Sequence, residues 1–408
     1  MTNRLYYTDP YLRAFDATVS SVDRDGDRLV VTLDRTAFYP TSGGQPFDTG
    51  TLGSLRVVDV FDRDDGSIGH VVEGGSAQRG DHVHGEIDWP RRFDHMQQHT
   101  GQHVLSAAFE HLFHVRTVSF HLGADVSTID LAREVTAAEI AAAEGEANRV
   151  VWEDRPVTIR FASAEDAAGL PLRKEPKREG TLRLIEVERF DLSACGGTHV
   201  ARTGAIGIIS VGAWERFKGG QRIEFLCGGR ALDRFRSLRD TVTASVRLLS
   251  VLPQELPGSI ERLQLEAKQQ KRVVAGLQSE LARYRADELL AGATDISLKD
   301  AEDAYRAARL VLRALDADAA ALKSLAMAVT AKNGHLVVLT STSRPALVVV
   351  ARSSDLEVSA QQIVAKLIAQ FGGRGGGKGE LAQGGGLDAE PDVILTAAHA
   401  EVTSSRQG

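Results

Sequence analysis

The spacing of apolar residues changes near Asp94, and this change restricts what the chain can fold into. Before it, in residues 11–90, apolar and polar residues alternate in segments such as RLVVTLDRTAF and SLRVVDVF, and turns such as DRDGD separate them. Alternation with a period of two predicts strands, and short strands with frequent turns are typical of a small barrel. After Asp94 the apolar residues recur with helical spacing, so the sequence predicts a barrel followed by a long helix.

The rest of the chain mixes helical and strand patterns. VTAAEIAAAEGEANRV at 135–150 predicts a second helix, and short strands follow. Helices are expected over 230–252 and 260–290, and residues 300–372 alternate between helix and strand. The predicted fold class is α+β and multidomain. Its domains are an N-terminal small β-barrel at 1–90, an α+β domain at 91–245, a helical hairpin linker at 246–290 and a C-terminal α/β glycine-rich domain at 291–408.

The helix expected over 260–290 carries a heptad pattern. Positions 260, 263, 267, 270, 274, 277, 281 and 284 are apolar except for Gln270. Such a seam either packs on the neighbouring helix of the same chain or forms a coiled coil with a second copy. We favour the first arrangement, and a homodimer through the helical or C-terminal region is the alternative.

Composition excludes several classes of protein. A chain of 408 residues with 43% hydrophobic content predicts two to four globular domains. Its longest apolar runs, such as ALVVVA at 346–351, fall far short of the roughly 20 residues that span a bilayer, so no membrane partner is expected. The N-terminus lacks the apolar segment of a signal peptide, and there are only two cysteines, Cys195 and Cys227. We therefore expect a cytoplasmic protein.

The charge of the chain gives no general indication of nucleic-acid binding. The net charge is −7, and residues 1–90 account for it with 15 acidic and 8 basic side chains. Charge alone therefore argues against a nucleic-acid partner. If the protein binds RNA, local groups must do so, such as those in GGRGGGKG at 372–379.

Two histidines of QHTGQHVLSAAF, His99 and His103, lie four residues apart on the predicted long helix. A helix turns about 100° per residue, so both imidazoles lie near one face, about 6 Å apart along the axis, and can reach one ion. Two helical histidines are also common as surface or packing residues. His95 offers a rival pair with His99, but it lies about 12 Å along the axis from His103 and cannot share an ion with it.

A second ligand pair follows in CGGTH at 195–199. Cys195 and His199 flank two glycines, which let the backbone fold close to an ion. One thiolate with three imidazoles suits zinc best among the common divalent ions. Because 91 residues separate the two pairs, the site is assembled across a domain, which favours an active site over a zinc finger. The rival interpretation is that Cys195 is a thiol nucleophile.

The segment RTAFYPTSGGQ at 35–45 offers a further candidate site. Gly43 and Gly44 allow a turn in which the backbone can approach a ligand, and Gln45 then presents an amide group. From the spacing alone, an ordinary β-turn explains this segment equally well.

The segment GGRGGGKGELAQGGG at 372–386 holds nine glycines in fifteen residues. It contains GxxxxGK, but Gly379 replaces the Ser or Thr of a P-loop and a helix is expected before it, which argues against nucleotide binding. A glycine-rich loop that binds an RNA phosphate fits better, and a flexible loop without a partner is the alternative. The candidate contacts are Arg374, Gly375, Gly376, Gly377 and Lys378.

Taken together, these segments resemble a known family. HTGQH, CGGTH, RTAFYPTSGGQPFDTG and IDWPRRFDHMQQHTGQHVLSAAF resemble the editing domain of alanyl-tRNA synthetases and of the free-standing AlaX editing proteins. The glycine-rich segment resembles the C-terminal domain of alanyl-tRNA synthetase, which is shared with DHH-type phosphoesterases. The chain begins on the barrel, without the aminoacylation domain of the synthetases, so the resemblance is to long-form AlaX proteins.

The resemblance implies roles for single residues. It assigns zinc to His99, His103, Cys195 and His199, and it leaves out His95, which is then expected to face solvent or to lie behind the ligands. It also places Thr36 and Gln45 in the substrate pocket, where the hydroxyl of Thr36 favours a seryl ester. This is physically reasonable, because a site that hydrogen-bonds a hydroxyl rejects an analogue that lacks one.

The function implied by the resemblance is zinc-dependent hydrolysis, in trans, of tRNA(Ala) mischarged with serine, with the glycyl ester as a further substrate. Gly101 and Gln102 lie between the helical histidines, where HExxH peptidases carry a glutamate, and this argues against a metalloprotease. Two alternatives stay open. One is a non-catalytic tRNA-binding protein with structural zinc, and the other is editing of Ser-tRNA(Thr).

Overall fold

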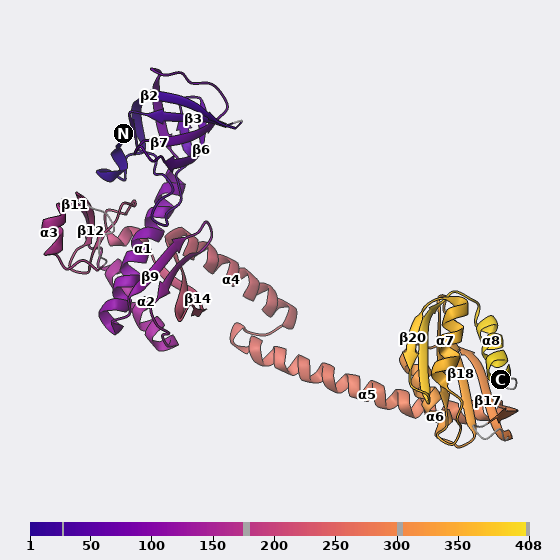
Figure 1. Cartoon of the computed structure of the whole chain (residues 1–408). Helices are drawn as coiled ribbons and strands as arrows, with labels where there is room; N and C mark the ends of the chain where they lie inside the picture. Colours follow the sequence, from indigo (N-terminus) through magenta and orange to yellow (C-terminus); the bar gives the residue numbers. More distant parts are fainter. Residues whose placement is uncertain (27, 174–179, 300–304, 405–408) are drawn as a thin grey trace. The chain divides into compact units, whose positions relative to one another are not determined.

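The computed structural model describes residues 1–26, 28–173, 180–299 and 305–404 (Figure 1). The chain divides into two compact units, which we call the N-terminal unit (residues 1–245) and the C-terminal unit (residues 246–408). In the described part of the chain, no helix combines the length and the apolar character needed to cross a bilayer.

The first strands of the N-terminal unit form the predicted barrel. They pair in the order β2-β3-β7-β6-β5-β8, and β2 also pairs with β8, which closes the barrel. Val19, Val31 and Val57 fill its interior with other apolar side chains. The barrel strands are β2 (Ala14–Asp25), β3 (Arg28–Leu33), β5 (Gly50–Leu52), β6 (Leu55–Asp62), β7 (Ile68–Glu73) and β8 (His82–Ile87); η1 (Leu5–Tyr7) and the parallel pair β1 (Asn3–Arg4) and β4 (Arg35–Thr36) complete this region.

The long helix α1 (Trp89–Phe113) begins near the change of hydrophobic period. Asp88 caps its first turn by accepting a hydrogen bond from the backbone of Arg91, and Pro90 is tolerated there because the first turn needs no N–H partner. The second predicted helix is α2 (Ala137–Trp152), which starts at a capping box of Thr136 and Glu139. Both helices pack in one core with a four-stranded sheet. Its strands, in the order β14-β15-β10-β9, are β14 (Ile209–Phe217), β15 (Gly220–Cys227), β10 (Ser127–Leu131) and β9 (Thr117–Leu122).

A second sheet of the N-terminal unit leads into CGGTH. It is antiparallel, in the order β11-β12-β13. Its strand β13 ends one residue before Cys195, whose backbone N–H donates to the carbonyl oxygen of Arg183 on β12 (3.1 Å). The sheet therefore fixes the start of the ligand loop. The elements here are β11 (Val157–Ala162), α3 (Ala164–Ala168), β12 (Leu182–Val187), β13 (Asp191–Ala194) and η2 (Thr203–Ile206).

Two helices, α4 (Gly228–Leu249) and α5 (Leu256–Ala291), occupy the predicted helical region, with η3 (Pro253–Glu255) between them. The last turns of α5 pack on the C-terminal sheet through Ala282, Ala286 and Leu290. The heptad seam of α5 is exposed, for example by 59% at Leu277 and 79% at Tyr284. A partner for this seam, in the same chain or in a second copy, stays a prediction.

The C-terminal unit is a six-stranded sheet with helices on both faces, as expected for an α/β domain (Figure 1). Alternate side chains of its buried strands face opposite sides: Leu336 and Val338 pack with α7 and α8, whereas Val337 and Leu339 pack with α5 and α6. The strand order is β16-β17-β18-β19-β21-β20. The elements are β16 (Thr294–Lys299), β17 (Tyr305–Leu315), α6 (Ala319–Thr330), β18 (His335–Ser341), β19 (Ala346–Arg352), α7 (Ala360–Phe371), β20 (Arg374–Gly377), β21 (Leu381–Leu387) and α8 (Pro391–Ser404).

The expectation of a glycine-rich loop at 372–379 is wrong, because residues 374–377 form the edge strand β20. Glycine is required there by close backbone approach. A Cβ atom at Gly375 would lie 2.2 Å from the carbonyl oxygen of Gln383, and one at Gly377 would lie 2.3 Å from that of Leu381. By contrast, a Cβ atom at Gly376 would meet nothing within 4 Å. The segment is therefore a fixed, exposed hairpin edge with bare backbone.

Candidate metal centre

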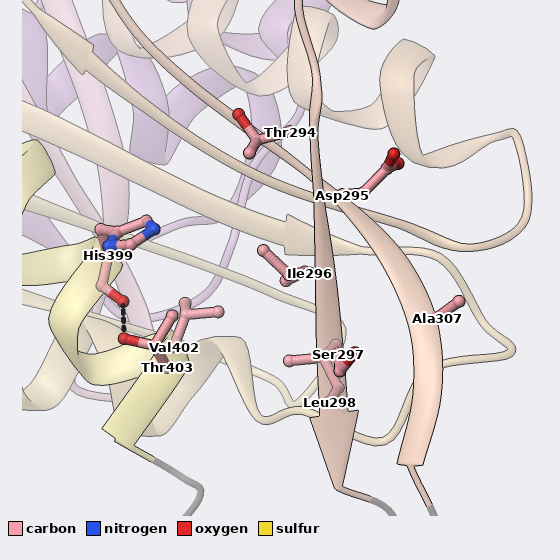
Figure 2. A pocket seen from close by; sticks show the side chains of 9 residues that line it. All are labelled: Thr294, Asp295, Ile296, Ser297, Leu298, Ala307, His399, Val402 and Thr403. Carbon is pink, nitrogen blue, oxygen red and sulfur yellow. Dashed lines mark hydrogen bonds between the residues drawn. The ribbon is translucent and has the colours of Figure 1, made fainter.

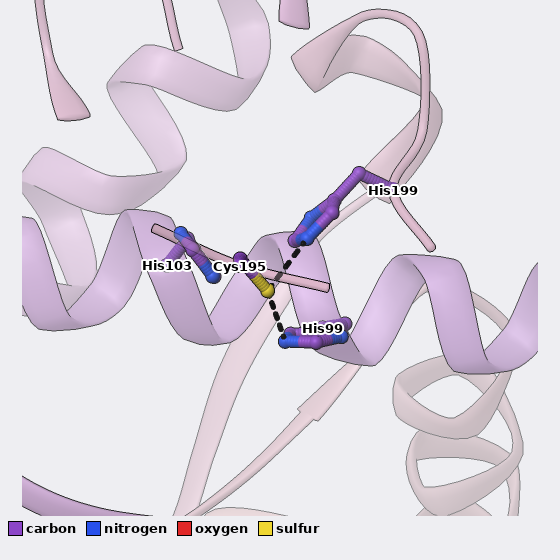
Figure 3. A group of neighbouring side chains, drawn as sticks. All are labelled: His99, His103, Cys195 and His199. Carbon is purple, nitrogen blue, oxygen red and sulfur yellow. Dashed lines mark hydrogen bonds between the residues drawn. The ribbon is translucent and has the colours of Figure 1, made fainter. Parts of the chain in front are cut away.

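The four predicted ligands converge on one point of the N-terminal unit. His99 and His103 lie one turn apart on α1, and Cys195 and His199 come from the CGGTH loop (Figure 3). Their potential ligand atoms all lie within 4.8 Å of one another. Cys195 Sγ is 3.4 Å from Nε2 of His99 and 3.4 Å from Nε2 of His199. A tetrahedral zinc site places sulfur and nitrogen ligands about 3.5 Å apart, so this set fits such an ion.

Each imidazole of the cluster is held from behind at Nδ1. His99 Nδ1 donates to Gln45 Oε1 (2.8 Å), and His103 Nδ1 donates to Asp191 Oδ2 (2.8 Å). His199 Nδ1 donates to Thr100 Oγ1 (3.2 Å), whose own proton goes to the carbonyl oxygen of Met96. In the neutral rings these partners place the proton on Nδ1 and leave Nε2 free, which is the form that binds a metal. The sequence reasoning did not identify Asp191 or Thr100, since only the fold brings them behind the histidines.

Asp191 is itself held in place. Its side chain is fully buried and accepts hydrogen bonds from Arg173 Nε (2.6 Å) and Ser193 Oγ (3.1 Å). Burial would raise the pKa of Asp191, but the hydrogen bond from His103 and the charge of Arg173 outweigh burial and hold its pKa below the usual value. The carboxylate therefore stays ionised and orients His103.

Gln45 acts on the cluster through His99. Besides His99, its Oε1 accepts from the backbone of Thr198 (3.0 Å), and its Nε2 donates to Thr198 Oγ1 (2.8 Å). Both ends of the fully buried amide are thus occupied within the chain. The segment before it is also the tight turn that the glycines allow, with φ of 55° at Gly43 and 87° at Gly44. Gln45 therefore ties the barrel loop to both halves of the ligand set.

Two glycines of the motifs are required by packing. A Cβ atom at Gly101, on α1, would lie 2.2 Å from the buried sulfur of Cys227. One at Gly197 would lie 2.1 Å from the ring of His99. Gly101 and Gly197 are therefore glycine because α1 packs tightly against β15 on one side and against the ligand loop on the other.

Cys195 has the properties of a metal ligand. Burial would raise the pKa of its thiol, but the His99 and His199 rings and hydrogen bonds from the cluster lower it well below the usual value. The thiolate, which is the ligand form, is thereby favoured. Cys195 is partly exposed and Gly196 is exposed, whereas the three histidines are buried. The part of the ligand loop nearest to solvent is therefore Cys195 and Gly196.

Thr36 lies inside the barrel with a fully buried hydroxyl. Its Oγ1 accepts from the backbone of Phe38 (3.1 Å) and contacts Nε2 of His70 (2.9 Å). His70 Nδ1 donates to the carbonyl oxygen of Val31 (2.9 Å), so Nε2 is the acceptor and Thr36 donates its proton to it. One lone pair of Thr36 Oγ1 is left, so this hydroxyl can accept one further hydrogen bond but cannot donate another.

Of the two positions expected for His95, facing solvent or behind the ligands, the first is wrong. Its side chain is 2% exposed, and its Nδ1 is buried without a hydrogen-bond partner. Burial is the main cause that lowers the pKa of His95 to about 4. Because the ring stays neutral at physiological pH, it packs into the core of α1 without a counter-ion.

A buried ion pair fixes the barrel loop to α1, and sequence reasoning missed it. Arg92 and Asp48 are both fully buried and joined through Nε at 3.0 Å to both carboxylate oxygens. Asp48 also accepts from the backbone of Tyr39, and Arg92 Nη1 donates to the carbonyl oxygen of Pro10 (2.9 Å). The pair holds residues 39–48, and so Gln45, against the helix that carries the histidines.

The C-terminal unit has surface hollows that contain none of the four predicted ligands. One, of about 380 Å³, lies between β16 and α8 (Figure 2). Its histidine, His399, is on the exposed side of α8, and the bond drawn there is an ordinary back-bond from Thr403 Oγ1 to the carbonyl oxygen of His399 (2.8 Å). The predicted contacts Arg374 to Lys378 line none of the described hollows, and all five residues are exposed.

Models of known families match three parts of the chain. The description "tRNA synthetases class II (A)" matches residues 11–91. "Threonyl and Alanyl tRNA synthetase second additional domain" matches residues 182–224, which include CGGTH, and "DHHA1 domain" matches residues 307–403.

Alignments with single proteins extend over the whole chain. The alanyl-tRNA editing protein AlaX-L of Pyrococcus horikoshii is 32% identical over 418 aligned positions, which cover 100% of both chains. The chain belongs to the AlaX-L family. The chain also matches alanine–tRNA ligases, at 34% identity for the ligase of Pyrococcus abyssi and 36% for that of Methanoculleus marisnigri. These alignments cover 94% and 95% of the chain but 42% of each ligase, so the chain spans less than half of their length.

Proposed function

We propose that this AlaX-L family member is a zinc-dependent trans-editing hydrolase that deacylates tRNA(Ala) mischarged with serine, and also with glycine. The family is one of alanyl-tRNA editing deacylases. The observation that carries the proposal is the ligand cluster itself. One thiolate and three imidazoles face one point, and Gln45, Asp191 and Thr100 hold the rings from behind. A bound zinc would supply Lewis acidity toward the ester carbonyl and its attacking water.

The side chains around the centre have separate tasks in this proposal. His99, His103, Cys195 and His199 hold the metal, and the exposed Cys195–Gly196 side admits the 3′ end of the tRNA. Thr36 accepts a hydrogen bond from the seryl hydroxyl, because its own proton is committed to His70. An alanyl ester offers no such donor, so discrimination rests on a polar contact and not on size. Gln45 positions His99 in this scheme and leaves the pocket wall to other groups.

The C-terminal unit binds tRNA in this proposal. The exposed edge strand β20 offers backbone groups, and Arg374 and Lys378 flank its glycines. Contacts of this kind to phosphates give affinity that falls with salt. The translation role fits a cytoplasmic protein, and the exposed α5 seam fits a homodimer.

The test is single-turnover hydrolysis of Ser-tRNA(Ala) and Ser-tRNA(Thr) by the full chain and by Cys195→Ala and His103→Ala. We expect the wild type to cleave Ser-tRNA(Ala) and both variants to fail. Preference for Ser-tRNA(Thr) would contradict the proposed tRNA identity.

A second candidate function is a non-catalytic tRNA-binding protein with structural zinc. The four-ligand set favours it, because structural zinc sites fill all four positions with protein ligands. Wild-type protein that holds zinc and binds tRNA(Ala) but leaves the seryl ester intact would decide for this candidate.

A further inference from the structure

Arg183, on β12, lies directly behind the ligand loop with only 7% of its surface exposed. Its Nη1 donates to the carbonyl oxygens of Cys195 (2.7 Å) and Gly197 (2.9 Å), and its Nε donates to that of Tyr7 (2.9 Å). Three of the five N–H groups of the guanidinium are thus used. These hydrogen bonds hold the loop, but their acceptors are neutral carbonyl oxygens.

The remaining nitrogen of Arg183, Nη2, is buried and has no hydrogen-bond partner. Among the described residues, no carboxylate forms an ion pair with Arg183. The other arginines around the site differ, since Arg92 pairs with Asp48 and Arg173 pairs with Asp191. The Cys195 thiolate acts on Arg183 electrostatically, but no anion is paired with the guanidinium. A buried cation without a paired anion is costly, so the position is expected to have a role beyond packing.

The metal centre does not supply the missing negative charge. A divalent ion with three neutral imidazoles and one thiolate keeps a net charge of about +1. Arg183 bonds to the carbonyl of Cys195 itself, so the two positive charges are neighbours. An anionic group that approaches the centre would therefore be attracted by both.

Tyr7 is the neighbour of Arg183 that lies nearest to the exposed part of the ligand loop. Tyr7 is half-buried, with its ring centroid 5.5 Å from Arg183 Cζ, and its hydroxyl lies over exposed Gly196, 3.6 Å from where a Cβ atom would be. The Tyr7 ring therefore contacts both the buried guanidinium of Arg183 and the exposed backbone of Gly196. Arg4, which also contacts this ring, is neutralised by Asp62 (2.6 Å), so the uncompensated charge belongs to Arg183.

We propose that Arg183 is a phosphate subsite that binds the phosphodiester next to the 3′-terminal nucleotide of the substrate through Nη2. The inference rests on the proposed function, which brings that nucleotide to the metal centre. A phosphodiester is permanently anionic, as Arg183 is permanently cationic, whereas an ester carbonyl is neutral when it binds. Phosphate oxygens also accept the paired N–H groups of a guanidinium.

The test compares ligands on the zinc-loaded full chain. The probes are the dinucleotide CpA, its uncharged methylphosphonate analogue and adenosine, with dissociation constants measured by titration. We expect CpA to bind about tenfold more tightly than the analogue, as one charged hydrogen bond provides. This ratio should fall to near one in Arg183→Gln and persist in Arg222→Gln, a control whose guanidinium pairs with Asp130 on another sheet. Equal binding of both dinucleotides to the wild type, or an unchanged ratio in Arg183→Gln, would overturn the proposal.

A second measurement uses the wild type, because Arg183→Gln also removes bonds that hold the ligand loop. The side-chain Nε signal of Arg183, assigned by its absence from the spectrum of Arg183→Lys, should shift with CpA and not with the methylphosphonate. A signal that responds to neither, or equally to both, overturns the subsite. Hydrolysis of Ser-tRNA(Ala) is assayed separately. Its absence would defeat the proposed function while a charge-dependent shift would still support the subsite.

Discussion

The two units of the chain differ in what they bury. The N-terminal unit buries many ionisable side chains: the three histidines of the metal centre, the Arg92–Asp48 pair, Asp191, Arg183, His70 and His95. In the described residues of the C-terminal unit, the one buried ionisable side chain is His335, and the sheet is packed with valine and leucine. What the C-terminal unit exposes instead is a strand of bare glycine backbone between two cations.

This difference separates chemistry from binding. A buried polar network is expensive to form and is retained where orientation matters, as it does for the Nδ1 partners of the three histidines. An exposed glycine edge costs little and offers no side chain for catalysis. This difference supports our proposal that the reaction takes place in the N-terminal unit and that the C-terminal unit contributes affinity for tRNA.

The largest expected effect is loss of the metal. His99→Ala should reduce zinc from about one ion per chain to a small fraction and lower the deacylation rate on the order of 1,000-fold. His95→Ala, one turn earlier on α1, is the matched control and should keep its zinc. Metal analysis of both variants checks this. Equal zinc content in both would refute the ligand assignment.

Acid should destabilise the N-terminal unit first. Burial lowers the pKa of His70 from 6.5 to about 4, so below pH 6.5 the unfolded chain binds a proton that the folded chain does not. The free energy of unfolding therefore falls as the pH drops from 6.5 to 4, by about 3 kcal/mol for this residue. Hydrogen exchange of the full chain, measured with zinc removed so that metal loss plays no part, should show faster exchange in residues 1–245. Equal acceleration of exchange in both units would contradict the expected difference in acid sensitivity.

The contribution of Asp191, which orients the ligand His103, should be measurable in a variant that keeps all four ligands. Asp191→Asn should weaken zinc binding by about 10- to 100-fold, because His103 loses a charged acceptor at Nδ1. Competition with a chelator of known affinity measures this. Asp154→Asn is the control, since Asp154 pairs with Arg202 and touches no ligand. No change in Asp191→Asn would show that the fold holds His103 without it.

Thr36→Val should reduce discrimination between seryl and alanyl esters by about 1–3 kcal/mol. The hydroxyl has two partners, His70 and Phe38, so some stability is lost as well. Thr36→Ser keeps the hydroxyl and should keep the discrimination. The ratio of kcat/KM for the two charged tRNAs measures the effect, and an unchanged ratio in Thr36→Val would remove Thr36 from the site.

The smallest expected effect lies in the C-terminal unit. Gly375→Ala places a Cβ atom 2.2 Å from the carbonyl oxygen of Gln383 and should disturb the β20–β21 hairpin, with tRNA affinity reduced by about fivefold. Gly376→Ala meets nothing within 4 Å and should bind tRNA as the wild type does. Zinc content should stay the same in both. Loss of tRNA affinity in Gly376→Ala but not in Gly375→Ala would contradict this expectation and would mean that tRNA contacts the face of β20 on which Gly376 lies.

Much of this organisation could be predicted from the sequence because it is local. The change of period at Asp94 predicted the barrel and α1, and the spacing within HTGQH and CGGTH predicted two ligand pairs. The features that could not be predicted depend on residues far apart in the sequence. The partners of His99 and His103, namely Gln45 and Asp191, lie 54 and 88 residues away. The glycines of β20 suggested a loop, since the carbonyl oxygens that require them belong to a strand several residues further on.

The claim that the metal centre of the N-terminal unit performs the hydrolysis is tested most directly by removing and restoring the metal. Single-turnover cleavage of Ser-tRNA(Ala) is followed with zinc-loaded, chelator-stripped and zinc-restored full chain, with Ala-tRNA(Ala) as the parallel substrate. We expect cleavage of the seryl ester to be lost when zinc is stripped and to return with about one zinc per chain, while the alanyl ester stays largely intact throughout. Cleavage that continues at full rate in folded, zinc-free protein would contradict this claim.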